Sequence, residues 1–276
     1  MIKLYSTAFF LLFIVASCKE STTAGAKGEW HYTKSYPLTN VYPVSITGDA
    51  AHLYITSGLK TEIHKMNYDG GLVEQIKNIR KPKYINALST GVEVVAESEA
   101  HVASRVQGQE GITTIPTNQF LETPYGVSVE GNNIVISDFS KNTVYYNNGG
   151  KVMNFGGTGN GNDQLNGPSD IQFKNGIIYL ADSKNNRVQV YDANAKYLKT
   201  IGNKDNIKTV GGIYVSDNEI GVTDYGGNRL LIYSDKGKLL QTFTENLEQP
   251  SDVFIRGREM FVVNYNANTI AVYSKW

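Results

Sequence analysis

The chain has 276 residues, with 26 Lys and Arg against 26 Asp and Glu, so its formal net charge at pH 7 is zero. This balance argues against nucleic acid as the main partner, because phosphate binding relies on clustered Lys and Arg that release counterions. The single cysteine excludes a disulfide scaffold and any metal cluster held by several cysteines, and 41% hydrophobic residues are enough for a substantial core.

Residues 1–17 have the features of an export signal. Lys3 supplies a positive charge, and residues 4–17 form an apolar or small-residue run that is shorter than the roughly 20 residues of a membrane-spanning helix. Small residues stand directly before Cys18, a pattern that resembles the cleavage site of bacterial lipoproteins. The resemblance implies cleavage before Cys18, lipid attached to Cys18, and an exported lipoprotein of the cell envelope, at the outer membrane or cell surface. An ordinary signal peptide with an incidental cysteine is the alternative.

The segment that follows, 18–28, is polar and built from small residues, without hydrophobic periodicity. Such a composition is typical of a flexible linker. We therefore expect a tether between the lipid and a folded part that begins at residue 29.

From residue 29 to residue 276 the chain repeats at about 40 residues. One polar residue is predicted to end the second strand of each unit, and another strand begins five residues later. These polar residues are Ser57, Glu97, Asp138, Asp182, Asp224 and Asn264, at spacings of 40, 41, 44, 42 and 40 residues. The fourth unit shows four predicted strands, at 170–173, 176–181, 187–191 and 197–201, separated by turns rich in Asn, Asp and Gly. Repeated four-stranded antiparallel sheets predict an all-β, six-bladed β-propeller over residues 29–276.

The two ends of the repeat region predict how the ring closes. The sixth unit has strands near 252–255, 259–263 and 269–274 but no outermost strand, whereas residues 29–35 form an extended segment without a partner. Pairing the two would cover an exposed strand edge. We therefore predict that the N-terminal strand completes the last blade.

The fourth unit resembles the NHL repeat. It contains a Gly-rich entry segment at 155–159, Pro168 at the start of an inner strand, and a turn that runs from Asp182 to Asn186 and Arg187. The fifth unit repeats the Asp-to-Arg turn at 224–229, and the other units match in spacing more than in sequence. The resemblance implies a propeller blade, and we expect the Asp and Arg side chains of the motif to brace the turn. It does not imply one function, because NHL propellers include binding modules, enzymes and RNA-binding domains.

Aromatic residues mark the face on which a propeller carries its longer loops. The residue after the polar position is aromatic in three units, at Phe139, Tyr225 and Tyr265, and Tyr125 lies near the start of the third inner strand. Aromatic side chains offer a large contact area at low entropic cost. We predict that these four residues form a ligand-binding platform, with packing between blades as the alternative.

Two carboxylates are candidate metal ligands. Asp170 and Asp252 occupy equivalent places at the start of inner strands, near the expected mouth of the central channel. Carboxylates suit a hard cation such as Ca²⁺, which takes six to eight oxygen ligands. The alternative is a turn cap, and no other cofactor is expected.

The histidines bear on a possible enzyme activity. Some NHL-type propellers are zinc-dependent lyases, and zinc there needs several converging histidines. Of the four histidines, only His101 is expected on the loop face, and no Ser-His-Asp order or phosphate loop is apparent.

Taken together, the sequence favours a binding module over an enzyme. We expect a monomeric, lipid-anchored propeller that recognises a peptide, protein or glycan on its loop face and does not bind nucleic acid. The alternative is a metal-dependent lyase or hydrolase acting at the channel mouth. A structural part of a cell-envelope complex is a third possibility.

Overall fold

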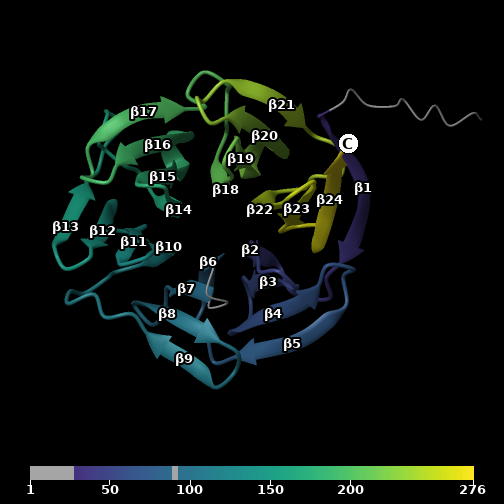
Figure 1. Ribbon diagram of the computed structural model, residues 1–276, viewed down its shortest axis with the longest axis horizontal. Coiled ribbons are helices and arrows are strands. Elements are labelled where there is room, and N and C mark those ends of the chain that lie inside the picture. Colours follow the sequence, from purple (N-terminus) through teal and green to yellow (C-terminus); the bar gives the residue numbers. More distant parts are fainter. Residues whose placement is uncertain (1–27, 89–92) are drawn as a thin grey trace, which may run out of the picture.

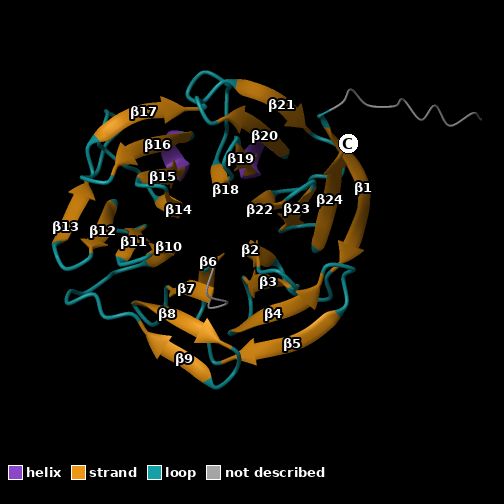
Figure 2. Cartoon of the chain, viewed as in Figure 1, coloured by secondary structure: helices purple, strands orange, loops and turns teal. Residues whose placement is uncertain are grey.

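The computed structural model describes residues 28–88 and 93–276, which form a ring of six four-stranded antiparallel sheets (Figure 1). Apart from strands and turns, this part of the chain has two short 3₁₀ helices, η1 (Ser183–Asn185) and η2 (Tyr225–Gly227) (Figure 2). No helix in it is long and apolar enough to cross a membrane. The predicted signal peptide, Cys18 and nearly all of the tether lie outside the described residues. The prediction of six four-stranded blades is confirmed.

Each blade runs from an inner strand at the axis to an outer strand at the rim (Figure 1). The inner strands are β2 (Pro43–Gly48), β6 (Pro82–Ala87), β10 (Pro124–Glu130), β14 (Pro168–Lys174), β18 (Val210–Val215) and β22 (Pro250–Arg256). The second strands are β3 (His52–Ser57), β7 (Glu93–Glu97), β11 (Asn133–Asp138), β15 (Ile177–Asp182), β19 (Glu219–Asp224) and β23 (Glu259–Asn264). The third strands are β4 (Glu62–Asn67), β8 (Val102–Gln107), β12 (Thr143–Asn148), β16 (Arg187–Asp192), β20 (Arg229–Ser234) and β24 (Thr269–Lys275). The outer strands are β5 (Leu72–Lys77), β9 (Gly111–Thr114), β13 (Val152–Gly156), β17 (Tyr197–Ile201), β21 (Leu239–Phe243) and β1 (Trp30–Pro37).

The N-terminal strand closes the ring, as predicted. Strand β1 pairs antiparallel with β24, from Trp30 opposite Lys275 to Pro37 opposite Thr269, and it extends two residues beyond the predicted segment. Trp30 is 2% exposed, and its indole Nε1 donates a hydrogen bond of 3.3 Å to Glu219 of the neighbouring blade. The closing strand is therefore fixed both by its strand partner and by a side chain buried against blade 5.

The hydrophobic core is divided among the interfaces between neighbouring blades. Each interface in the described part of the chain has its own cluster of buried residues; between blades 4 and 5, for example, Val188 and Val190 pack with Ile213 and Val222. A four-stranded sheet has two faces to bury, so each blade depends on both neighbours. Stability is therefore shared around the ring.

Buried polar side chains fix the connections between blades. In blade 5, Oδ1 of the fully buried Asp224 accepts hydrogen bonds from the backbone N–H groups of Lys208 and Thr209 in the preceding linker. Its Oδ2 accepts a bond of 2.8 Å from Nε of Arg229. The residue before Arg229, Asn228, has a φ of 51°, a left-handed conformation that Asn tolerates better than most residues. The Asp-to-Arg turn therefore braces the linker, as expected from the sequence.

The same anchor recurs in the other blades. The second-strand residue accepts a hydrogen bond from a linker amide at Glu97, Asp138, Asp182 and Asn264, while Ser57 donates one to a linker carbonyl. Because all six residues hold the linker against the end of the second strand, the linkers and the loops after those strands open on one end of the ring. We call this end the loop face.

Candidate functional site

A pocket of about 240 Å³ lies at the loop-face mouth of the central channel, where the inner strands begin. All four aromatic residues predicted as a ligand platform line it. Its walls are formed by Val44, Tyr84, Tyr125, Phe139, Ser169, Ser183, Lys184, Thr209, Val210, Gly211, Tyr225, Ser251 and Tyr265. The structure therefore brings together side chains from all six blades.

The repeat itself positions three of the aromatic residues. Phe139, Tyr225 and Tyr265 each follow the buried anchor of their blade, and each donates its backbone N–H to a carbonyl of the inter-blade linker, at 2.9, 2.9 and 3.0 Å. Because one hydrogen bond fixes the backbone at each position, the three rings face the axis from equivalent places. Their common placement follows from the period of the sequence.

The aromatic rings form two groups across the mouth. The rings of Tyr125 and Phe139 stack with centroids 4.7 Å apart and an interplanar angle of 26°, and Tyr84 lies 6.1 Å from Tyr125. The rings of Tyr225 and Tyr265 meet edge to face at 6.2 Å. Burial raises the pKa values of Tyr84, Tyr125 and Tyr225 above that of a free phenol, so these side chains stay neutral at physiological pH.

Tyr84 is a member of the site that sequence reasoning missed. Its hydroxyl donates a hydrogen bond of 3.2 Å to the carbonyl of Ser251, so its ring reaches across the axis from blade 2 to blade 6. On blade 5, Gly212 leaves room for it, because a methyl group there would lie 2.9 Å from Cε1 of Tyr84. Tyr84 is the third residue of its inner strand, as Asp170 and Asp252 are of theirs. A comparison of the third residue of the inner strand in all blades would have identified Tyr84 as a residue of the site.

The two candidate metal ligands, Asp170 and Asp252, form hydrogen bonds between blades. Asp170 accepts bonds of 2.8 Å from the backbone N–H groups of Ile171 and Ile213, the latter on blade 5. Asp252 accepts bonds from the Ser45 hydroxyl and the Ile46 amide on blade 1. Burial raises the pKa of Asp170 to about 7 and that of Asp252 well above its usual range, the latter also through repulsion by Asp170.

Metal ligands do not converge around these carboxylates. Across residues 28–88 and 93–276, no three His, Cys, Asp or Glu side chains come together in a way that could hold a metal ion. The oxygens of Asp170 and Asp252 are occupied by backbone and hydroxyl donors, so the side chains present do not fit a calcium site of six to eight oxygens. The calcium site stays a prediction, to be tested by metal analysis.

The histidines lie away from the mouth. His101 is in the β7–β8 loop, where its Nδ1 lies 2.6 Å from the carbonyl oxygen of Glu122 and its ring packs against Phe120. His64 is buried against Glu62 in β4, His52 starts β3 at the opposite end of the ring, and His31 stacks on Trp276 at the rim. None of the four lines the aromatic pocket.

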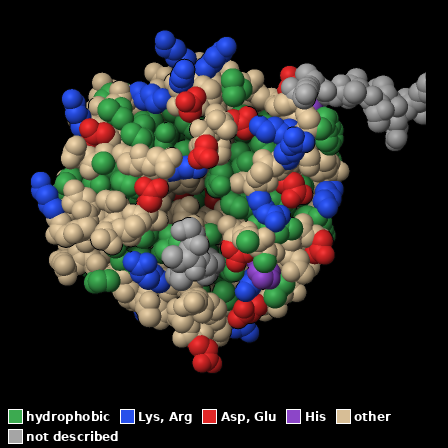
Figure 3. Space-filling model, in the orientation of Figure 1, with side chains coloured by type: hydrophobic (Ala, Val, Ile, Leu, Met, Phe, Trp, Pro, Cys, Tyr) green, Lys and Arg blue, Asp and Glu red, His purple; other side chains and the backbone are tan. Residues whose placement is uncertain are grey.

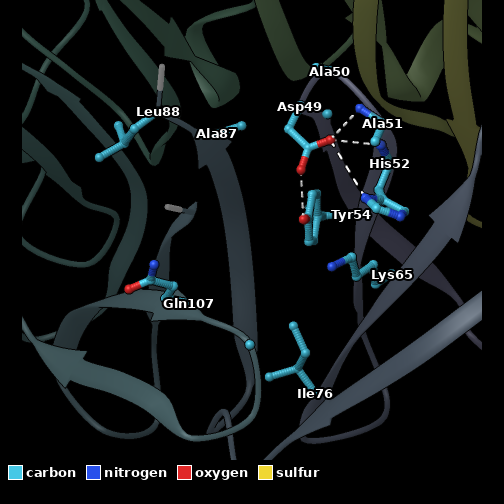
Figure 4. A pocket seen from close by; sticks show the side chains of 12 residues that line it. Asp49, Ala50, Ala51, His52, Tyr54, Lys65, Ile76, Ala87, Leu88 and Gln107 are labelled. Carbon is cyan, nitrogen blue, oxygen red and sulfur yellow. Dashed lines mark hydrogen bonds and ion pairs between the residues drawn. The ribbon is translucent and has the colours of Figure 1, made fainter. Parts of the chain in front are cut away.

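The opposite end of the ring has larger and more polar hollows. One, of about 740 Å³, lies between blades 1 and 2, with Asp49, His52 and Tyr54 on one wall and Leu88 and Gln107 across from them (Figure 4). Asp49 accepts hydrogen bonds from two amides of its own turn and from the Tyr54 hydroxyl. Asp49 therefore stabilises the turn that carries it.

A second hollow, of about 580 Å³, lies at the other mouth of the channel and includes Arg105, Glu130, Gln172 and Lys174. Figure 3 shows one face of the ring, hollowed at its centre and surrounded by charges of both signs. The apolar aromatic lining is thus a property of the loop-face mouth.

Comparisons with known proteins agree with this architecture. The sequence matches the NHL repeat over residues 165–191, in blade 4. No curated protein sequence matches the chain. Similar solved structures include virginiamycin B lyase from Staphylococcus aureus (15% identity, TM-score 0.66, covering 90% of this chain and 100% of that one) and a streptogramin B lyase (15%, 0.65, 90% and 88%). A catalytically inactive histidine-to-alanine variant of the former lyase, with quinupristin, is 18% identical, with a TM-score of 0.63 over 90% and 88% of the two chains. At these identities the likeness concerns the fold alone.

Proposed function

We propose that this protein is an exported, lipid-anchored, monomeric propeller that binds a protein or peptide by taking one apolar side chain into the aromatic mouth of its loop face. The observation that carries the proposal is the convergence of Tyr125, Phe139, Tyr225 and Tyr265 on one pocket. Clusters of exposed or half-buried aromatic side chains are characteristic of binding surfaces.

The size of the pocket supports a small inserted group. Its volume of about 240 Å³ is below the roughly 300–1,000 Å³ of pockets that enclose a whole drug-sized ligand. One aromatic or aliphatic side chain fits such a space, while the rest of a larger partner would lie on the surrounding loops. This geometry suits a protein or an extended peptide.

The polar groups of the pocket favour a peptide over a glycan. Sugar recognition needs hydrogen-bonding groups that are available to the ligand, but the serine and threonine hydroxyls here bond to the protein's own backbone, and the Tyr225 hydroxyl bonds to Gln249. Ser183 donates to the Val210 carbonyl at 2.7 Å, Ser251 to that of Pro43 at 2.7 Å, and Thr209 to that of Lys208 at 2.7 Å. An apolar side chain of a peptide needs no hydrogen bond from these groups.

Selection of binding peptides tests the proposal. A display library would be screened against the purified protein, and the affinity of a selected peptide compared between the wild type and the triple variant Phe139→Ala, Tyr225→Ala, Tyr265→Ala. We expect the triple variant to lose at least tenfold in affinity, since each buried aromatic contact contributes roughly 1 kcal/mol or more. The control carries Leu72→Ala and Leu240→Ala, two exposed residues on outer strands, and should bind as the wild type does. Unchanged binding by the triple variant would refute the site assignment.

The lipid anchor is tested separately. Labelled palmitate should be incorporated into the full chain in a bacterial host and should not be incorporated into the Cys18→Ala variant, because Cys18 is the proposed site of lipid attachment. Several acyl chains on that one residue can hold a protein at a membrane. Soluble, unlabelled wild-type protein would contradict the proposed lipid anchor and would not affect the proposal about the binding site.

A metal-dependent lyase or hydrolase is the second candidate, and its support is the likeness of the fold to two lyases. The described residues do not offer a converging ligand set, and no histidine lines the pocket. Stoichiometric Ca²⁺ or Zn²⁺ in the dialysed protein, lost on Asp170→Ala or His101→Ala, would favour this candidate. Metal-free protein that binds the selected peptide would favour the binding module.

A further inference from the structure

Two lysines lie against the stacked rings at the mouth. The ammonium group of Lys83, on β6, lies 4.8 Å from the ring centre of Tyr125, and that of Lys184, in η1, lies 4.7 Å from the ring centre of Phe139. Because Tyr125 and Phe139 stack on each other, the four side chains form one continuous assembly from blades 2, 3 and 4. We call it the lysine–aromatic stack.

Neither ammonium group of this stack has an anionic partner. Within residues 28–88 and 93–276, no hydrogen bond or ion pair is formed by Nζ of Lys83 or Lys184, whereas Lys174 and Lys275 elsewhere bind Asp217 and Glu219 at 2.8 Å. Lys83 is also half-buried, and burial, together with the charge of Lys81, lowers its pKa. A half-buried cation that only an aromatic face stabilises is an incomplete electrostatic arrangement.

We infer that the ligand carries a carboxylate next to its inserted apolar group, and that the positive charges of Lys83 and Lys184, each on a different ring of the stack, attract this carboxylate. The inference rests on the proposed function, because it specifies the chemistry of the partner that enters the same mouth. The apolar walls take the side chain, and a carboxylate at the edge supplies the anion that the half-buried Lys83 lacks, while the exposed Lys184 adds a second positive charge beside the pocket. Hydrogen bonds between charged partners are stronger than neutral ones and add geometric specificity.

The carboxylate has two sources in a peptide: its C-terminus or an acidic side chain. Three probes separate them from each other and from a neutral ligand: N-acetylphenylalanine, its primary amide, and N-acetyl-aspartyl-phenylalaninamide. Each would be titrated into the full-length protein, with the dissociation constant read from the chemical shifts of the pocket residues. The variants are the pair Lys83→Gln and Lys184→Gln, and the control Lys236→Gln, which removes an exposed charge from the β20–β21 turn.

We expect at least one acid to bind the wild type roughly three- to tenfold more tightly than the neutral amide, as for a partly exposed charge pair. The acid that gains affinity identifies the source of the carboxylate. The Lys83 and Lys184 double variant should bind all three probes with the affinity of the amide, and Lys236→Gln should match the wild type. The preference should also weaken from 50 to 500 mM salt.

Two further outcomes separate the inference from the proposed function. Equal binding of acids and amide to the wild type, with binding still lost in Phe139→Ala, would overturn the carboxylate inference and leave the aromatic site intact. No binding of any probe, or binding that Phe139→Ala does not weaken, would overturn both.

Discussion

The two ends of the central channel are built from the same six inner strands, yet they differ in chemistry and in how they are held. At the loop face the strands begin, five of them with a proline, and buried anchors such as Asp224 fix each linker against the end of a second strand. The mouth there is small and aromatic. At the opposite end the hollows are two to three times larger and include Arg105, Lys174 and Glu130.

The difference shows where a propeller can hold a ligand-binding surface in a fixed geometry. At the loop face, distant segments are tied together by buried hydrogen bonds, so the aromatic rings are held before any ligand arrives. At the opposite end, the Asp49 turn is capped mainly by its own residues, and one bond from the exposed Arg256 of blade 6 reaches its Ala50 carbonyl. Four predictions test this contrast, from the largest expected effect to the smallest.

The largest effect is expected from the anchors. Asp224→Ala leaves the Arg229 guanidinium and the linker amides without their partner, and loss of one member of a buried pair costs about 3–5 kcal/mol of unfolding free energy. Asp49→Ala, in the opposite turn, removes a local cap and should cost about 1 kcal/mol. Urea titration measures both, and equal losses would refute the contrast between the two ends.

The next effect concerns Tyr84, which lines the aromatic mouth and bonds from blade 2 to blade 6. Tyr84→Ala removes a ring that spans the axis and should cost about 3 kcal/mol through the cavity it leaves. Tyr84→Phe keeps the ring and loses the bond to Ser251, so its cost should be about 1 kcal/mol. Similar losses of unfolding free energy for both variants would mean that the hydroxyl of Tyr84, and not the packing of its ring, determines stability.

A pH effect follows from the carboxylates at the start of the inner strands. Because burial raises the pKa of Asp170 to about 7, the folded protein holds a proton that the unfolded chain releases near pH 4. The stabilisation is complete below pH 4 and is lost as the pH rises toward 7, a loss of about 2 kcal/mol between pH 5 and 7. Asp170→Asn should reduce the slope of urea midpoints over this range by about half, because Asp252, whose pKa is also raised, still contributes. A wild-type midpoint that stays constant or rises over this range would contradict the assignment.

The smallest effect is expected in the linker between blades 3 and 4. The Arg187 guanidinium donates hydrogen bonds to the carbonyls of Asn160, Gly161 and Gln164. Lysine cannot reproduce this planar set of donors, so Arg187→Lys should cost about 1 kcal/mol and speed hydrogen exchange of amides in 157–166. The control is exchange in the 203–208 linker, held by Arg229, which should not change. Equal acceleration in both linkers would indicate a global loss of stability.

Much of the fold could be predicted from the sequence because a blade repeats its turns at a fixed period. The six anchors and the unpaired segment at Trp30 were sufficient for the blade number and the closure. The positions of Phe139, Tyr225 and Tyr265 followed as well, since each comes one residue after an anchor, and the structure places all three at the mouth. Their role in binding stays a prediction.

Other features depend on distances across the ring, which the sequence does not contain. The pattern of an inner strand indicates which side chains face the axis, but not which of six residues fills it; Tyr84 does so because Gly212 leaves space for it. Lys83 on blade 2 stacks on Tyr125 on blade 3. This contact could not be predicted, because blade 2 keeps the spacing of the repeat but little of its sequence. The metal interpretation of Asp170 and Asp252 considered their charge without the backbone donors of the neighbouring strands.

A crystal structure of the protein with a peptide selected for binding tests the central claim most directly, because it locates the occupied surface without relying on any variant. The account predicts an apolar side chain of the peptide between the Tyr125–Phe139 and Tyr225–Tyr265 pairs. A peptide seated in the polar hollow at the opposite end, or paired along an outer strand, would contradict it.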